Sequence, residues 1–100
     1  MAERDLKKST KALVFRLIKV VEALPNTKLG NTIGYQLIRC GTAVGANYQA
    51  SCRARSVKEF VAKLGVVIEE KDETLFWLEI IMEAELLASL NYGRIIQNRW

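Results

Sequence analysis

The sequence predicts an all-α protein, a single-domain antiparallel up-and-down helical bundle. Three observations lead to this prediction. Apolar residues recur at helical spacing in three long segments, at about residues 5–24, 28–54 and 57–88. The only proline, Pro25, lies between the first two segments, and both connections are short, which favours neighbouring helices that run antiparallel. Half of the 100 residues are hydrophobic, which suits an ordered core.

The first segment has the pattern of an amphipathic helix. Apolar residues follow i, i+3 and i+4 spacing from Leu6 to Leu24, and lysines and arginines occupy the other side. Pro25 ends this helix, because the residue before a proline is pushed away from helical geometry. Asn26 and Thr27 then offer side-chain oxygens that can cap the second helix.

The second segment carries four glycines at helical positions, which are Gly30, Gly34, Gly41 and Gly45. Each glycine inside a helix costs about 0.8–1 kcal/mol relative to alanine, so a close contact is expected in return. The pairs 30/34 and 41/45 are spaced so that their members share one helix face. We predict that this strip packs against a helix of the same chain or of another copy, in preference to a ligand.

The third segment opens with a capping box, Ser56-Val57-Lys58-Glu59, which predicts a helix from Val57. Its apolar residues form two flanks, and such a helix usually touches two neighbours. One flank holds Val57, Val61, Leu64, Ile68, Leu75, Leu78 and Met82, and the other includes Phe60, Val67, Trp77, Ile80, Ile81 and Ala84. Residues 91–100 are expected to be an irregular tail after the stop signal Asn91-Tyr92-Gly93.

The chain lacks the residues of most catalytic sites. It has no histidine, no phosphate- or dinucleotide-binding glycine loop and no nucleophile elbow. The acidic run 69–73 points in several directions around a helix, so we interpret it as a solvated face. Cys40 and Cys52 are too far apart on one helix for a disulfide, at about 18 Å, and are interpreted as small buried hydrophobes. We predict a non-enzymatic protein without catalytic residues, cofactor or metal.

Charge is distributed unevenly along the chain. Residues 1–58 contain 11 Lys/Arg and 3 Asp/Glu, whereas residues 59–90 contain 2 and 8. The acidic third segment could simply complement the basic helices, within the bundle or between copies. The sharper interpretation is a surface that neutralises phosphates. Its candidate residues are Arg39, Arg53, Arg55, Lys58, Lys7, Lys8 and Lys11.

Several stretches carry a resemblance to a known family. These are QLIRCGTAVGANY at 36–48, CRARS at 52–56, KEF at 58–60 and EEKDETLFWLE at 69–79. They resemble the four-helix bundle proteins encoded in intervening sequences of bacterial 23S ribosomal RNA. That family is similar to the accessory variability determinant proteins of diversity-generating retroelements, which are basic and pentameric and work with a reverse transcriptase and RNA.

The resemblance implies a bacterial homopentamer, with RNA or DNA and a protein such as a reverse transcriptase as candidate partners. Glycines 30, 34, 41 and 45, together with Trp77, are the expected packing or oligomer contacts. Family members continue into a fourth helix, whereas this chain ends NYGRIIQNRW, so we expect that helix to be missing or truncated.

Two functions follow as expectations. The first is an RNA-binding accessory module that uses a basic surface on the first two helices. The alternative is a structural or protein-interaction module without nucleic-acid binding. No apolar run is long enough to span a membrane and no secretory signal is recognised at the amino end, so a cytoplasmic location is expected.

Overall fold

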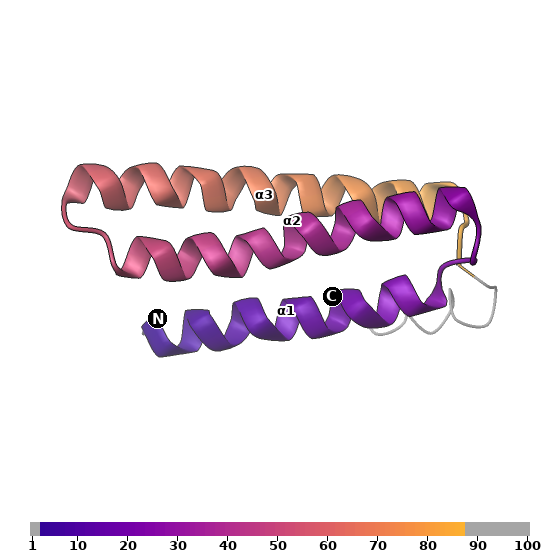
Figure 1. Ribbon diagram of the computed structural model, residues 1–100, viewed down its shortest axis with the longest axis horizontal. Helices are drawn as coiled ribbons and strands as arrows, with labels where there is room; N and C mark the ends of the chain where they lie inside the picture. Colours follow the sequence, from indigo (N-terminus) through magenta and orange to yellow (C-terminus); the bar gives the residue numbers. More distant parts are fainter. Residues whose placement is uncertain (1–2, 88–100) are drawn as a thin grey trace.

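The computed structural model describes residues 3–87. Within that range the chain forms three helices and no strand: α1 (Glu3–Ala23), α2 (Lys28–Cys52) and α3 (Val57–Glu83). Figure 1 shows α2 running antiparallel to α1 and then α3 running antiparallel to α2. The predicted all-α, up-and-down bundle is confirmed. The expectation of a missing fourth helix concerns residues 88–100, which lie outside the described range.

The amino ends of α2 and α3 are capped by the residues that the sequence indicates. The Thr27 hydroxyl accepts a hydrogen bond from the Gly30 amide at 3.1 Å, and the Ser56 hydroxyl accepts one from the Glu59 amide at 3.1 Å. One detail of the capping box differs. The Glu59 carboxylate accepts from the Arg55 amide at 3.1 Å, one residue before the Ser56 amide that the motif predicts.

Helix α3 ends at Glu83, earlier than the expected end near residue 88. Glu85 has a φ of 53°, in the left-handed region. The Glu85 amide donates to the Met82 carbonyl at 3.2 Å and the Leu86 amide donates to the Ile81 carbonyl at 3.1 Å. These two bonds form a Schellman motif, which terminates a helix without the glycine that usually signals it. The α2 helix likewise ends at Cys52, two residues before the expected boundary.

The hydrophobic core lies toward the α1–α2 connection. It is formed by the second half of α1, the first half of α2 and the last turns of α3, with the buried residues Leu17, Val20, Ile33, Leu37, Leu78, Ile81 and Leu87. By contrast, α3 contains no buried residue before Thr74. The first half of α3 therefore contributes little to this core.

Three glycines of α2, Gly34, Gly41 and Gly45, face α1 of the same chain, and Gly30 faces the α1–α2 connection. A Cβ at Gly30 would collide with the Pro25 carbonyl, and one at Gly41 would collide with the end of the Leu17 side chain. A Cβ at Gly34 would lie 3.1 Å from Val21, and one at Gly45 would lie 3.4 Å from Thr10. The sequence left open whether this strip packs against a helix of the same chain or of another copy. In the structure it contacts α1 of its own chain.

The apolar surface of α3 is buried toward the end of the helix and exposed toward its start. Leu78 from one predicted flank and Ile81 from the other both pack into the core. Val57, Val61, Ile68 and Leu75, which belong to the same flank as Leu78, are all exposed. Among residues 3–87, the first two thirds of that flank therefore have no covering neighbour.

Candidate nucleic-acid interface

The register of α1 against α2 decides where the basic side chains meet. Gly41 lies opposite Leu17 and Gly45 lies opposite Thr10, so residue numbers rise on one helix as they fall on the other. The start of α1 therefore lies beside the end of α2 and the α2–α3 connection, at one end of the molecule (Figure 1). Cations that are more than 40 positions apart in the sequence come together there.

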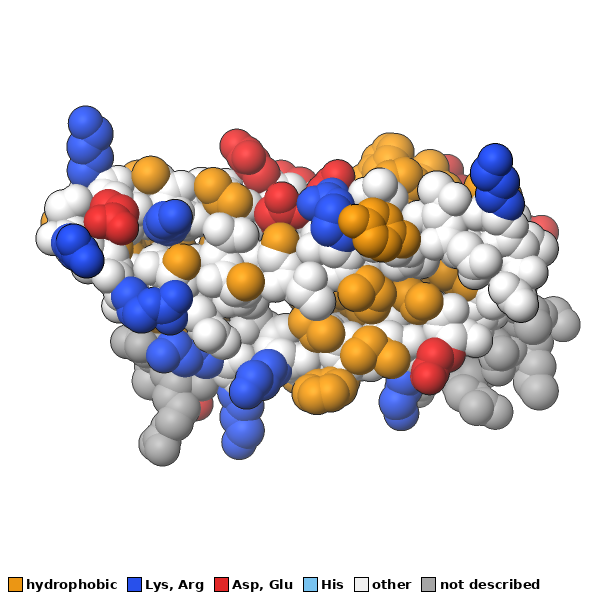
Figure 2. Space-filling model, in the orientation of Figure 1, with side chains coloured by type: hydrophobic (Ala, Val, Ile, Leu, Met, Phe, Trp, Pro, Cys, Tyr) orange, Lys and Arg blue, Asp and Glu red, His pale blue; other side chains and the backbone are white. Residues whose placement is uncertain are grey.

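We call this region the basic end and define it by Lys7, Lys8, Lys11, Arg53, Arg55 and Lys58. All are exposed except Lys7, which is half-buried. Figure 2 shows lysine and arginine side chains concentrated at this end. Two acidic residues of the described range that also lie at this end are Asp5 and Glu59. The Glu59 carboxylate accepts a hydrogen bond from the Arg55 amide in the α2–α3 connection. The basic end is thus a positively charged surface built from three segments of the chain.

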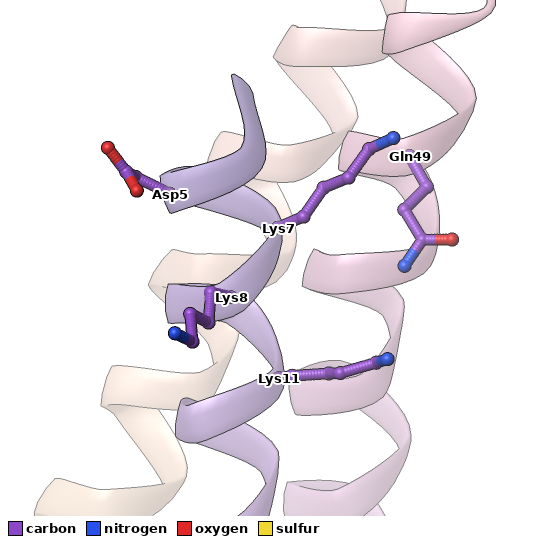
Figure 3. A pocket seen from close by; sticks show the side chains of 5 residues that line it. All are labelled: Asp5, Lys7, Lys8, Lys11 and Gln49. Atoms are coloured by element: carbon purple, nitrogen blue, oxygen red, sulfur yellow. The ribbon is translucent and has the colours of Figure 1, made fainter. Parts of the chain in front are cut away.

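A shallow hollow lies on the α1 side of the basic end. It is lined by Asp5, Lys7, Lys8, Lys11 and Gln49. In Figure 3 Lys7 and Lys11 extend toward α2, with the end of Lys7 beside Gln49, while Asp5 and Lys8 point away. Two ammonium groups and a carboxamide can together contact the phosphate and sugar oxygens of one strand. The sequence argument did not single out Gln49, although its place one turn before Arg53 could have indicated it.

Arg39 lies outside the basic end. Its guanidinium donates a short hydrogen bond to the Glu73 carboxylate of α3, and it lies 3.6 Å from a Glu70 carboxylate oxygen. The hydrogen bond that Arg39 donates to Glu73 raises the pKa of Arg39. Two carboxylates thus pair with this cation between α2 and α3, and the phosphate contact expected of Arg39 stays a prediction.

Trp77, the expected packing residue, is half-buried on α3. It packs against the core cluster and makes an edge-to-face contact with Phe76, with ring centroids 5.2 Å apart and planes at 75°. Its indole N–H is buried, with no hydrogen-bond partner among the described residues. The side chain therefore contributes to packing within the chain.

The two cysteines differ in their surroundings. Cys40 is fully buried, and its sulfur accepts a hydrogen bond from the Thr74 hydroxyl at 3.3 Å. Cys52 is only half-buried, so the prediction of burial is too strong for it. In residues 3–87 no group of three or more histidine, cysteine or acidic residues is placed to hold a metal ion.

The fold and this surface define the class of protein: an all-α, antiparallel helical-bundle protein with one basic end. A solved structure from Bacteroides thetaiotaomicron has this fold and is described as a protein with unknown function from the S23 ribosomal protein family. It is 26% identical, covers 94% of this chain and 84% of its own, and superimposes with a TM-score of 0.79. The chain is thus similar in fold and sequence to an S23-family protein, which agrees with the resemblance that the sequence motifs indicated.

Other comparisons add no relative. No family model matches the chain, and no curated protein matches it. None of the helices described between residues 3 and 87 combines the length and apolar character needed to cross a bilayer.

Proposed function

We propose that this protein is a non-enzymatic, oligomeric accessory module that binds nucleic acid, with RNA as the expected ligand, through the basic end. The observation that carries the proposal is the convergence of Lys7, Lys8 and Lys11 with Arg53, Arg55 and Lys58. Most acidic residues of α3 belong to its second half, from Glu69 onward, which leaves the basic end available to a phosphate backbone.

Phosphate contacts of this kind predict a specific salt dependence. Each neutralised phosphate releases condensed counterions, so the logarithm of affinity falls linearly with the logarithm of salt concentration. For single-stranded nucleic acid the slope is about −0.7 per contact. The slope therefore counts the cations that contact the strand.

The test is binding of a fluorescently labelled single-stranded RNA, followed by anisotropy over a series of salt concentrations. The double variant R53A/R55A is expected to weaken binding and to reduce the slope by about 1.4, which corresponds to two lost contacts. The matched control is K28A/K71A, which removes two exposed lysines outside the basic end. Equal losses in both variants, or affinity no higher than that of an unrelated protein of equal charge, would refute the proposal.

The proposed assembly and location follow the family resemblance. We propose a bacterial, cytoplasmic homo-oligomer, with a pentamer favoured and a reverse transcriptase as a candidate protein partner. Light scattering after gel filtration, at low and at high salt, measures the mass of the assembly directly. A discrete mass of five chains at both salts supports the pentamer, and a single chain contradicts it.

A second candidate function is a structural or protein-interaction module without nucleic-acid binding. The exposed apolar flank of α3 favours it, because monomeric proteins rarely leave such a stripe uncovered. RNA affinity at physiological salt distinguishes the two functions, since this module requires none.

A further inference from the structure

Phe15 of α1 is a large aromatic side chain that the bundle leaves in solvent. It is 64% exposed, although Leu13 and Leu17, two positions before and after it, both pack into the core. Two positions correspond to about 200° around a helix, so Phe15 points away from the core. Among residues 3–87 no other ring contacts it. The packing of the chain therefore does not explain why an aromatic residue stands at this position.

The other exposed phenylalanines of the described range do have such an explanation. Phe76 makes the edge-to-face contact with Trp77. Phe60 lies 14 positions before the buried Thr74, which is close to four whole turns, so it stands on the core side of α3. Of these three residues, Phe15 is the one on the outer side of its helix.

Lysines flank Phe15 on the same side of α1. Lys8 and Lys11 lie seven and four positions before it, Lys19 lies four positions after it, and all three are exposed. We call Lys8, Lys11, Phe15 and Lys19 the α1 stripe. No acidic residue occurs in the sequence from Lys8 to Lys19, and the next one is Glu22. Figure 2 shows basic and hydrophobic side chains following one another along α1.

The α1 stripe is continuous with the basic end. Lys8 and Lys11 belong to both, and Lys11 also lines the hollow beside Gln49. Phe15 follows Lys11 by four positions, about 6 Å along the helix axis. One nucleotide can therefore place its phosphate against the Lys11 ammonium and its base against the Phe15 ring.

We propose that Phe15 is a base-stacking residue, and that the ligand of the basic end is a single strand whose unpaired bases reach α1. Proteins hold single strands by this combination, in which cations contact the phosphates and an aromatic ring stacks on the face of a base. A duplex offers the same phosphates but keeps its bases stacked on one another. This contact rests on the RNA binding proposed above, and it adds the class of strand and an interaction that involves no charge.

The test compares two labelled strands of equal length and charge by anisotropy: a single-stranded RNA and the same backbone without bases. The wild type is expected to bind the RNA at least about fivefold more tightly. Phe15→Ala should remove this preference and leave the salt slope unchanged, because no cation is lost. Phe15→Trp should keep the preference, whereas Phe15→Leu, which is apolar but not aromatic, should lose it. Circular dichroism verifies that each variant remains helical.

The matched control is Tyr35→Ala. Tyr35 is 67% exposed, similar to Phe15, but it lies on α2 next to Gly34, which faces Val21 and Leu24 near the end of α1. This variant should bind both strands like the wild type. A duplex of the same RNA provides a second control, since the wild type and Phe15→Ala should bind it equally.

The outcomes separate this contact from the proposed function. If Phe15→Ala kept the preference for bases, or if Phe15→Leu bound RNA like the wild type, stacking at Phe15 would be refuted while salt-dependent binding at the basic end stood. Equal RNA affinity of the wild type and Phe15→Ala would instead fit a protein contact at Phe15, and it too would refute stacking. A wild type that bound neither strand would overturn both proposals.

Discussion

Arg39 of α2 is hydrogen-bonded to Glu73 of α3, so the most central cation of the second helix is part of the bundle's internal charge pairing. Its guanidinium also donates to the Gln36 side chain at 3.1 Å on its own helix. A Glu70 carboxylate oxygen lies 3.6 Å from Nη1 of the same guanidinium, whereas Glu73 is bound through Nη2. An arginine held in this way has its donors directed at protein acceptors and little positive potential left for a phosphate.

The first prediction is that Arg39→Ala leaves RNA affinity and its salt slope close to wild type. The substitution removes a cation whose charge two carboxylates already balance. Anisotropy titrations beside R53A/R55A make the comparison. If Arg39→Ala reduced the salt slope by half as much as R53A/R55A does, Arg39 would contact RNA as each of those two arginines does.

The second prediction concerns the glycines of α2, which should differ in their tolerance of alanine. At Gly45 the added Cβ meets Thr10 at 3.4 Å, an ordinary contact, so the helix gains up to about 1 kcal/mol from propensity. At Gly30 the added Cβ collides with the Pro25 backbone, and overpacking of this kind costs about 1–3 kcal/mol. Chemical denaturation at one fixed protein concentration measures both changes.

Gly41→Ala provides the intermediate case. The obstacle there is the end of the Leu17 side chain, which can rotate but is itself fully buried. Its stability should fall between those of the other two variants. Equal stability of Gly30→Ala and Gly45→Ala would contradict this prediction. It would show that the close approach of the Pro25 backbone does not require glycine at position 30.

Local signals account for the parts of the fold that the sequence predicted well. The caps at Thr27 and Ser56 and the stop at Pro25 depend on residues within one turn of the helix end, so one sequence contains the whole interaction. The end of α3 was predicted late because Glu85 adopts a left-handed conformation that glycine or asparagine normally signals.

Tertiary contacts account for what the sequence could not resolve. The antiparallel pairing expected from short connections correctly brings Lys7, Lys8 and Lys11 to the end of α2. The pairing of Arg39 with Glu73 depends on the rotation of α3 about its axis, which spacing alone leaves undetermined. The same rotation decides that Val61 and Ile68 face outward.

The third prediction is that Glu85→Gly stabilises the protein. A non-glycine residue in the left-handed region costs about 1–2 kcal/mol, and glycine removes that cost. Glycine also raises the conformational entropy of the unfolded chain, which offsets part of the gain. The expected net gain is about 0.5–1 kcal/mol. Thermal unfolding measures it, with Glu83→Gly as the control, because the same change inside the helix should be destabilising.

The fourth prediction is that the two cysteines differ in reactivity toward an alkylating reagent. Burial raises the pKa of the Cys40 thiol, an effect that its hydrogen bond from Thr74 only partly opposes. Because the thiolate is the reactive form, Cys40 should remain protonated and unmodified at a mildly alkaline pH where an ordinary thiol begins to ionise. The half-buried Cys52 should be alkylated first.

Mass spectrometry after timed alkylation reads out this difference at each site. In denaturant both cysteines should react at similar rates, which serves as the control for intrinsic reactivity. The raised pKa also has a consequence for stability: the folded state keeps Cys40 neutral, so this contribution is full below the ordinary thiol pKa and declines as the pH rises above it. Cys40→Ala should lessen that decline, whereas equal alkylation of both thiols in the native protein would show that the α2–α3 interface opens readily around Cys40.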